Sequence, residues 1–143
     1  MTQTITVAER RIHRIRARRL HRAITLVAAA VFAMIVWTIS VPVLGVDLIA
    51  GHGSSAQPVG PVSIAIVPLL AGGIGWALLA LLERAGTTGR RVWRIVGWVV
   101  LALSLIGPIT MATSAGVLIS LLLMHLAVGT TLLIGLFSAG ENA

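Results

Sequence analysis

Four long apolar stretches, separated by short polar or basic connections, dominate the pattern of this chain. They cover residues 24–44, 64–82, 92–109 and 115–137, and the only charged residue within them is Arg94. Each is close to the roughly 17–25 residues that an α-helix needs to cross about 30 Å of hydrocarbon. In lipid the backbone must satisfy its own hydrogen bonds, and membrane β-strands would instead alternate over about ten residues. The pattern therefore predicts an all-α polytopic membrane protein with four transmembrane helices in an antiparallel bundle.

The basic residues give this bundle an orientation. All eleven are arginines: seven precede the first stretch and four lie within residues 84–94, whereas the connections at 45–63 and 110–114 have none. Since positively charged flanks stay on the cytoplasmic side, an even number of crossings puts both clusters and both termini in the cytoplasm. The mean hydropathy of +1.02 is too high for a water-soluble domain of this size. We expect a protein of the bacterial cytoplasmic (inner) membrane, with a basic segment at 1–23, a membrane domain at 24–137 and a cytoplasmic tail at 138–143.

Residues 1–23 have the pattern of a basic amphipathic helix. Thr6 and Glu9 have capping-box spacing, and Ile12 and Ile15 lie one turn apart with arginines on the other faces. One interpretation is a clamp on anionic phospholipid headgroups, worth about 1 kcal/mol for each arginine near the surface. The other is a segment that sets topology and continues the first membrane helix into the cytosol. Nucleic acid is disfavoured, because the charge is tethered at a bilayer and lacks interleaved aromatic residues. The arginines assigned to lipid headgroups are Arg10, Arg11, Arg14, Arg16, Arg18, Arg19, Arg22, Arg90, Arg91 and Arg94.

A weak internal repeat runs through the chain. Arg18-Arg19 leads into the first stretch and Arg90-Arg91 into the third, and each of these two stretches ends with a serine followed by a proline. Two copies of a helical hairpin, arranged as parallel repeats about an axis along the membrane normal, would produce this pattern. Chance similarity between apolar segments is the other explanation.

His125 is the most conspicuous polar group inside a predicted span. Ten residues at 1.5 Å each place it about 15 Å deep, where an ionisable side chain is costly and is expected to face the protein. A functional histidine here would relay a proton or ion, ligate haem, or hydrogen-bond a quinone-like ring. A structural histidine, which we favour, would donate to a carbonyl freed by a proline or to a nearby hydroxyl residue. The intramembrane hydroxyl residues considered are Thr38, Ser40 and Ser104.

No cofactor, metal or catalytic activity is expected. Haem between helices usually needs a second axial ligand, and only Met34 and Met111 offer a weak one, since the other histidines flank the spans. A metal site at His125 lacks a second histidine or carboxylate at the same depth, and the chain has no cysteine. The motifs G-x-S-x-G, the P-loop and H-E-x-x-H are absent, so the chain is not predicted to be an enzyme.

The longest connection, residues 45–63, holds Asp47 and His52. A short helical or re-entrant element at 46–50 would bring Asp47 to the outer mouth of the bundle, where it would collect cations, cap a helix or pair with His52. A path from Asp47 past His125 would make the protein a small transporter or channel. At the opposite face, Glu83 is expected to pair with an arginine of the following loop or of the N-terminal segment.

Small residues predict where helices pack closely. Ala71 and Gly75 have small-xxx-small spacing around Gly72 in the second stretch, and Gly129 and Gly135 recur in the fourth. Because lipid removes the hydrophobic drive between helices, close backbone approach supplies the packing energy. These faces would serve packing within one chain, or assembly into a homo-oligomer or with a partner membrane protein.

Four short runs, at 41–47, 76–84, 103–108 and 124–129, read VPVLGVD, WALLALLER, LSLIGP and MHLAVG. Together they resemble a family of small four-helix integral membrane proteins, found mainly in high-G+C Gram-positive bacteria and catalogued as a domain of unknown function. The resemblance covers most of residues 20–137 and implies a fold and a membrane location, but no activity or ligand. The favoured function is a non-catalytic membrane protein that packs with itself or a partner and binds anionic lipid. The alternatives are the transporter or channel, and a quinone- or haem-binding subunit.

Overall fold

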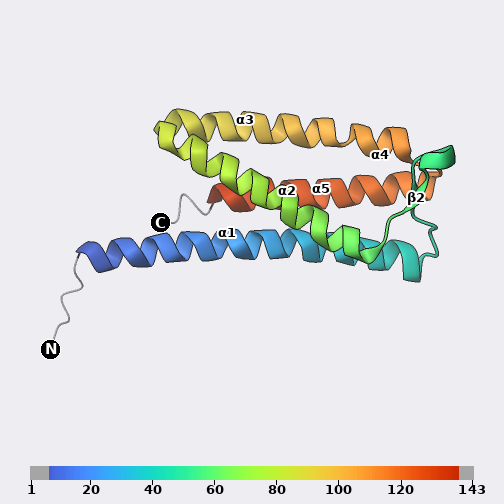
Figure 1. The fold of residues 1–143 in the computed structure, drawn as a ribbon, viewed down its shortest axis with the longest axis horizontal. Coiled ribbons are helices and arrows are strands. Elements are labelled where there is room, and N and C mark those ends of the chain that lie inside the picture. The colour runs from blue at the N-terminus through green and yellow to red at the C-terminus, as the bar shows by residue number, and fades with distance from the viewer. Residues whose placement is uncertain (1–6, 139–143) are drawn as a thin grey trace.

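Helices make up most of the computed structural model, which describes residues 7–138 (Figure 1). The mostly helical class predicted from the sequence is confirmed. The start of the predicted basic segment, residues 1–6, and nearly all of the predicted tail, residues 139–143, lie outside the described residues. In chain order the elements are α1 (Val7–Thr38), the π-helical turn η1 (Ile39–Val43), β1 (Ile49–Ala50), the 3-10 turn η2 (Gly53–Ser55), β2 (Gln57–Pro58), α2 (Pro61–Leu82), the 3-10 turn η3 (Glu83–Ala85), α3 (Gly86–Ser104), α4 (Ile106–Met111) and α5 (Ala115–Ser138).

α1 is a single unbroken helix of 32 residues. It contains no glycine or proline, and its seven arginines and seven alanines favour helix. The predicted boundary between residues 23 and 24 is therefore not a break in the structure, and the basic segment continues the first helix outward. Figure 1 shows the N-terminal part of α1 projecting past the α2–α3 turn and the end of α5. At its other end α1 passes into η1, where Pro42 has no N–H to continue the hydrogen-bond ladder.

Within residues 7–138, three segments are long and apolar enough to cross a membrane: Ile12–Val43, Pro61–Met111 and Ala115–Ser138. The predicted count of four transmembrane helices is not matched, because the second and third predicted stretches fall in one helical run of 51 residues. The run is continuous since η3 joins α2 to α3 without a loop. α3 also begins and ends earlier than the predicted range 92–109, and α4 is a separate short helix.

Two glycines shape the turn between α2 and α3. Gly86 has a φ of +65°, a left-handed conformation that residues with a Cβ rarely adopt. A Cβ on Gly89 would lie 1.7 Å from the carbonyl oxygen of Leu82, so only glycine lets the first turn of α3 pass so close to the end of α2. From this turn, α2 and α3 leave as two arms that separate toward the other end of the molecule (Figure 1).

At that other end, residues 45–60 form a small β-hairpin with η2 in its loop, and not the helical or re-entrant element predicted at 46–50; α2 then begins at Pro61. β1 and β2 pair antiparallel, and glycines with positive φ turn the chain before and after β1. Nε1 of Trp37 donates to the carbonyl oxygen of Val59 at 3.0 Å. The backbone N–H of Gly51 donates to the carbonyl oxygen of Met111 at 2.9 Å. These bonds tie the hairpin to α1 and α4.

The packed part of the bundle consists of α1, α5 and α2, since α1 makes its most extensive contacts with the other two. α3 contacts α5 and α2 less extensively. Four of the glycines predicted to mediate packing lie against side chains of this same chain, whereas Ala71 is exposed. Gly72 faces Leu26 and Leu132, Gly75 faces Trp93 and Leu136, Gly129 faces Leu101, and Gly135 faces Thr25.

Gly89→Ala should disrupt the α2–α3 turn. The added methyl group would meet the carbonyl oxygen of Leu82, a backbone atom that cannot rotate away, and overpacking typically costs about 1–3 kcal/mol. Gly73→Ala is the matched control, because a Cβ there has nothing within 4 Å and alanine favours helix over glycine by about 1 kcal/mol. Unfolding in mixed detergent, followed by circular dichroism, should show lower stability for Gly89→Ala and unchanged or higher stability for Gly73→Ala. Equal stability of the two variants would contradict the close approach at Gly89.

Candidate functional site

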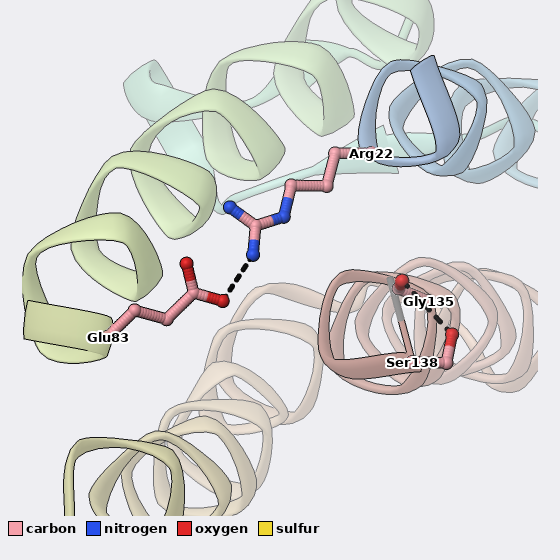
Figure 2. Close-up of polar contacts among 4 residues, drawn as sticks. All are labelled: Arg22, Glu83, Gly135 and Ser138. Carbon is pink, nitrogen blue, oxygen red and sulfur yellow. Dashed lines mark hydrogen bonds and ion pairs between the residues drawn. The ribbon is translucent and has the colours of Figure 1, made fainter. Parts of the chain in front are cut away.

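A buried ion pair joins α1 to the α2–α3 turn. Nη2 of Arg22 donates to Oε1 of Glu83, and Figure 2 shows the two side chains reaching toward each other from α1 and from the end of α2. The Arg22 side chain is only 4% exposed and that of Glu83 23%. The sequence assigned Arg22 to lipid headgroups, but the structure places it inside the protein, because the carboxylate of Glu83 is its partner. The expected pairing of Glu83 with an arginine of the N-terminal segment is the arrangement found.

A small polar cavity, the inner pocket, lies beside this ion pair. Its volume is about 180 Å³, and it is lined by Arg18, Glu83, Gly86 and Arg90. Arg22 pairs with the one carboxylate, Glu83, and Arg18 and Arg90 line the pocket beside it, so within residues 7–138 the pocket has two positive charges in excess. The Nε atoms of Arg18 and Arg22 are buried and have no hydrogen-bond partner within residues 7–138. The inner pocket therefore combines an excess of positive charge among residues 7–138 with two arginines, Arg18 and Arg90, in its lining.

The other arginines predicted to bind headgroups fall into two groups. Those on the projecting part of α1 are exposed, and at 1.5 Å per residue Arg10 lies about 12 Å beyond Arg18 along the helix axis. Those near the inner pocket are also exposed, and the guanidinium of Arg94 lies 5.4 Å from the centre of the Phe137 ring, a cation–π distance. The first group is Arg10, Arg14 and Arg16 and the second is Arg19, Arg91 and Arg94, whereas the side chain of Arg11 lies outside what the structure describes.

An apolar cleft of about 640 Å³ lies between α2, α3 and α5. Aliphatic side chains and glycines form nearly all of its lining. Val67, Ile74 and Val100 belong to this lining and are each more than half exposed, so the cleft opens to the surroundings of the helices. Ala71, predicted as a packing residue, also lines the cleft. Such an opening in a membrane-spanning region would give lipophilic molecules access from the bilayer.

His125 lines this cleft from α5. Its Nδ1 lies 2.8 Å from the carbonyl oxygen of Leu121, one turn earlier in the same helix. Because a carbonyl only accepts, Nδ1 carries the proton of this bond, and Nε2 of the neutral ring keeps a free lone pair. The partner is thus a carbonyl of its own helix and not one freed by a proline or a hydroxyl of another element.

The hydroxyl residues considered as partners of His125 are bonded or placed elsewhere. The hydroxyls of Thr38 and Ser104 donate to carbonyl oxygens of their own helices, at 2.9 and 2.7 Å. Ser40 is buried in η1, at the end of α1. Of the three, only Ser104 lines the same cleft as His125.

The residues predicted at the outer mouth do not meet His125. Asp47 and His52 are both exposed in the connection around β1, and neither lines the cleft. Met34 and Met111 are likewise absent from the lining that contains His125. In the part of the chain that the structure describes, no three metal-ligating side chains come together.

Residues 13–141 match the model of a protein family that is described as "Family of unknown function (DUF6069)". The chain belongs to this family. The resemblance predicted from short apolar runs, to a family without an assigned function, is confirmed at this level. Comparison with curated proteins and with solved structures finds no match. For this DUF6069 protein, any functional conclusion therefore depends on the inner pocket and the cleft.

Two cleft residues of this DUF6069 protein were not predicted. Trp93 is 5% exposed, and its buried Nε1 has no hydrogen-bond partner within residues 7–138. A Cβ on Gly97 would lie 2.6 Å from Leu133, just as Gly129 lies against Leu101. The signal that could have revealed this contact is reciprocal: a glycine and a leucine four residues apart on α3 face a glycine and a leucine four apart on α5.

Glu83→Leu should destabilise this DUF6069 protein by about 3 kcal/mol, because it leaves the guanidinium of Arg22 buried without a counter-charge. Adding Arg22→Leu to this variant should recover much of the loss, since no charge then stays buried. Titration with dodecyl sulfate of the wild type, both single variants and the double variant gives the coupling energy of the pair. If the two single losses simply add in the double variant, the ion pair is not the contact described here.

Proposed function

We propose that this protein is a non-catalytic integral membrane protein that crosses the cytoplasmic membrane four times and binds an anionic phospholipid at its cytoplasmic face. The observation that carries the proposal is the inner pocket. There Arg18 and Arg90 line a pocket that contains a single carboxylate, Glu83, which is already paired with Arg22, and this leaves an excess of positive charge. The phosphate of a lipid headgroup is an anion that a bilayer supplies at the edge of its hydrocarbon.

The length of the second apolar segment supports four crossings. As one straight helix its 51 residues would extend about 76 Å, more than twice the roughly 30 Å of hydrocarbon. α2 instead runs toward the turn at η3, and α3 runs back from it toward the other end of the molecule (Figure 1). With 22 residues, α2 is about 33 Å long, and α3 followed by α4 is of similar length. Each arm is therefore sufficient for one crossing, which returns both termini to the side of the arginines.

The length of α1 and η1 supports a place for the inner pocket at the cytoplasmic edge of the hydrocarbon. From Arg22 to Val43, α1 and η1 cover about 32 Å at 1.5 Å per residue, close to the hydrocarbon thickness. The guanidinium groups of Arg18 and Arg90 then fall in the headgroup layer. The projecting end of α1 stands beyond that layer, which favours the arginines at the pocket over Arg10 and Arg14 as lipid contacts.

Arginine suits phosphate because its planar guanidinium presents several donors in a fixed fork and is weakly hydrated. The volume of about 180 Å³ corresponds to about six water molecules, which is room for a phosphate group. Glu83 balances Arg22 within the protein, so the charges of Arg18 and Arg90 stay available to a ligand.

Two features support binding over catalysis and over obligatory assembly. The hydroxyls of Ser104 and Ser120 donate to carbonyls of their own helices, and His125 uses Nδ1 in the same way, so these two serines are not paired with His125 as a nucleophile would be. The glycines predicted to mediate helix contacts lie against side chains of this chain. The proposal therefore needs neither a reacting group nor a second copy.

Arg18→Gln combined with Arg90→Gln should weaken binding of phosphatidylglycerol by about 25-fold, since two headgroup contacts of about 1 kcal/mol each are lost. The matched control is Arg10→Gln with Arg14→Gln, which removes the same charge from the projecting end of α1. Native mass spectrometry of protein released from nanodiscs of phosphatidylglycerol and phosphatidylcholine counts the retained lipids. Equal losses in the two variants would assign binding to overall charge, and a wild type without preference for the anionic lipid would refute the proposal.

Single cysteines test whether α2 crosses the membrane, as the four-crossing topology requires, because the chain has no cysteine of its own. Ser54→Cys lies in η2 and Thr88→Cys in the first turn of α3, and both positions are exposed. A membrane-impermeant maleimide should label residue 54 in bacterial cells whose inner membrane is intact, and residue 88 only after that membrane is permeabilised. If both residues were labelled from the same side, the number of crossings between them could not be odd, and this topology would be wrong.

A further inference from the structure

The cleft between α2, α3 and α5 is independent of the inner pocket and has its own chemistry. Its volume of about 640 Å³ falls in the range of about 300–1,000 Å³ typical of sites for small organic molecules. Such sites are mostly apolar with a few placed polar groups. The polar groups of this cleft therefore decide which small molecule it can bind.

Glycine contacts set the register between the walls. Gly97 on α3 lies against Leu133, and Leu101 lies against Gly129, so α3 and α5 run antiparallel and each step along one is matched by a step back along the other. Three residues beyond Leu101, Ser104 is therefore level with residue 126, directly beside His125. Both side chains line the cleft, so a hydroxyl and an imidazole share one depth in it.

The register with α2 adds a third polar group at this depth. Gly72 lies against Leu132 and Gly75 against Leu136, so α2 runs parallel to α5 with an offset of about 60 residues. Ile64 is thus level with His125. Pro68, one turn later, has no N–H, and the carbonyl oxygen of Ile64 therefore lacks its usual helical donor. Ile64 and Pro68 both line the cleft.

All three groups present hydrogen-bond acceptors, and Ser63, which precedes Ile64 in the same lining, adds a hydroxyl that can accept or donate. His125 has committed its Nδ1 proton to the carbonyl of Leu121, which leaves Nε2 as a lone pair. Ser104 has committed its hydroxyl proton to the carbonyl of Leu101, which leaves the lone pairs of Oγ. The Ile64 carbonyl can only accept. The cleft therefore holds acceptors on three walls at a single level, about 15 Å from the outer end of α5.

A ligand that fits must bring donors to this level and apolar surface elsewhere. An acyl chain offers no donor and leaves these acceptors unpaired, which is unfavourable for each buried group. A lipid alcohol offers one donor, which satisfies one wall. A ring with two hydroxyls can reach two walls, while its alkyl tail lies along the aliphatic lining and leaves through the opening beside Val67 and Ile74.

We propose that this cleft binds a lipophilic hydroquinone, with one ring hydroxyl donating to Nε2 of His125 and the other to Oγ of Ser104 or to the carbonyl oxygen of Ile64. The oxidised quinone carries carbonyl oxygens in place of these hydroxyls. It would set acceptor against acceptor at His125, Ser104 and Ile64, whereas the unpaired N–H of Trp93 lies eleven residues before Ser104 on α3, about 16 Å away. The site therefore discriminates between the two oxidation states by binding, without taking part in electron transfer.

Calorimetry with the protein in detergent, under anaerobic conditions, tests this with decyl-benzohydroquinone and decyl-benzoquinone as probes. The wild type should bind the hydroquinone at least tenfold more tightly than the quinone. His125→Phe should lower hydroquinone affinity about tenfold and remove most of the preference, since one hydrogen bond to the ring is lost. His125→Gln keeps an acceptor and should keep the preference, and thermal unfolding of both variants checks that they fold.

Leu123→Phe is the matched control, because Leu123 lies at the same depth of α5 and is exposed, but does not line the cleft. It should bind like the wild type. Equal affinity for the two probes, or an unchanged preference in folded His125→Phe, would overturn the proposal. Decanol that competes as well as the hydroquinone would also overturn it, because the cleft would then recognise only an apolar body.

Discussion

The ion pair between Arg22 and Glu83 is the interaction on which the rest of this molecule depends. It ties α1 to the turn between α2 and α3, and both partners are largely removed from solvent. In such surroundings neither charge is stable alone, so the helices stay within hydrogen-bonding distance at this point. The same carboxylate sets the charge balance of the inner pocket, because it neutralises Arg22 and leaves Arg18 and Arg90 in excess.

The cleft follows from the same turn. Gly86 and Gly89 let α3 reverse direction directly after α2, and Gly97 and Gly129 then hold α3 against α5. α2, in contrast, makes its most extensive contacts with α1. Because α2 packs mainly against α1 and α3 packs against α5, the two helices separate beyond their shared turn and leave a space between them. The cleft is therefore a consequence of where the glycines stand, and its apolar lining suits a bilayer, where such a space need not hold water.

The two candidate sites use different kinds of polar group, and the dielectric explains the division. Guanidinium groups gather at one end of the bundle, where a headgroup layer can solvate or neutralise them. Deeper in the bundle, the polar groups are a histidine and a serine, each hydrogen-bonded to a carbonyl of its own helix. Only groups of this second kind can remain partly unpaired at low dielectric without a large cost.

The chain's sequence alone determined a mostly helical protein, the extent of its long apolar runs and the membership of a family without an assigned function, because run lengths and local motifs need no tertiary contact. It also predicted that Glu83 would meet an arginine, but not which one. It placed a boundary at residue 23 where charge changes, whereas helix propensity does not change there and α1 is continuous. Only the tertiary structure decided that Arg22 is buried, that α2 and α3 diverge, and that Ser104 and the Ile64 carbonyl lie level with His125. The physical reason is that helices surrounded by lipid are apolar on every side, so their sequence period does not reveal which face meets which neighbour.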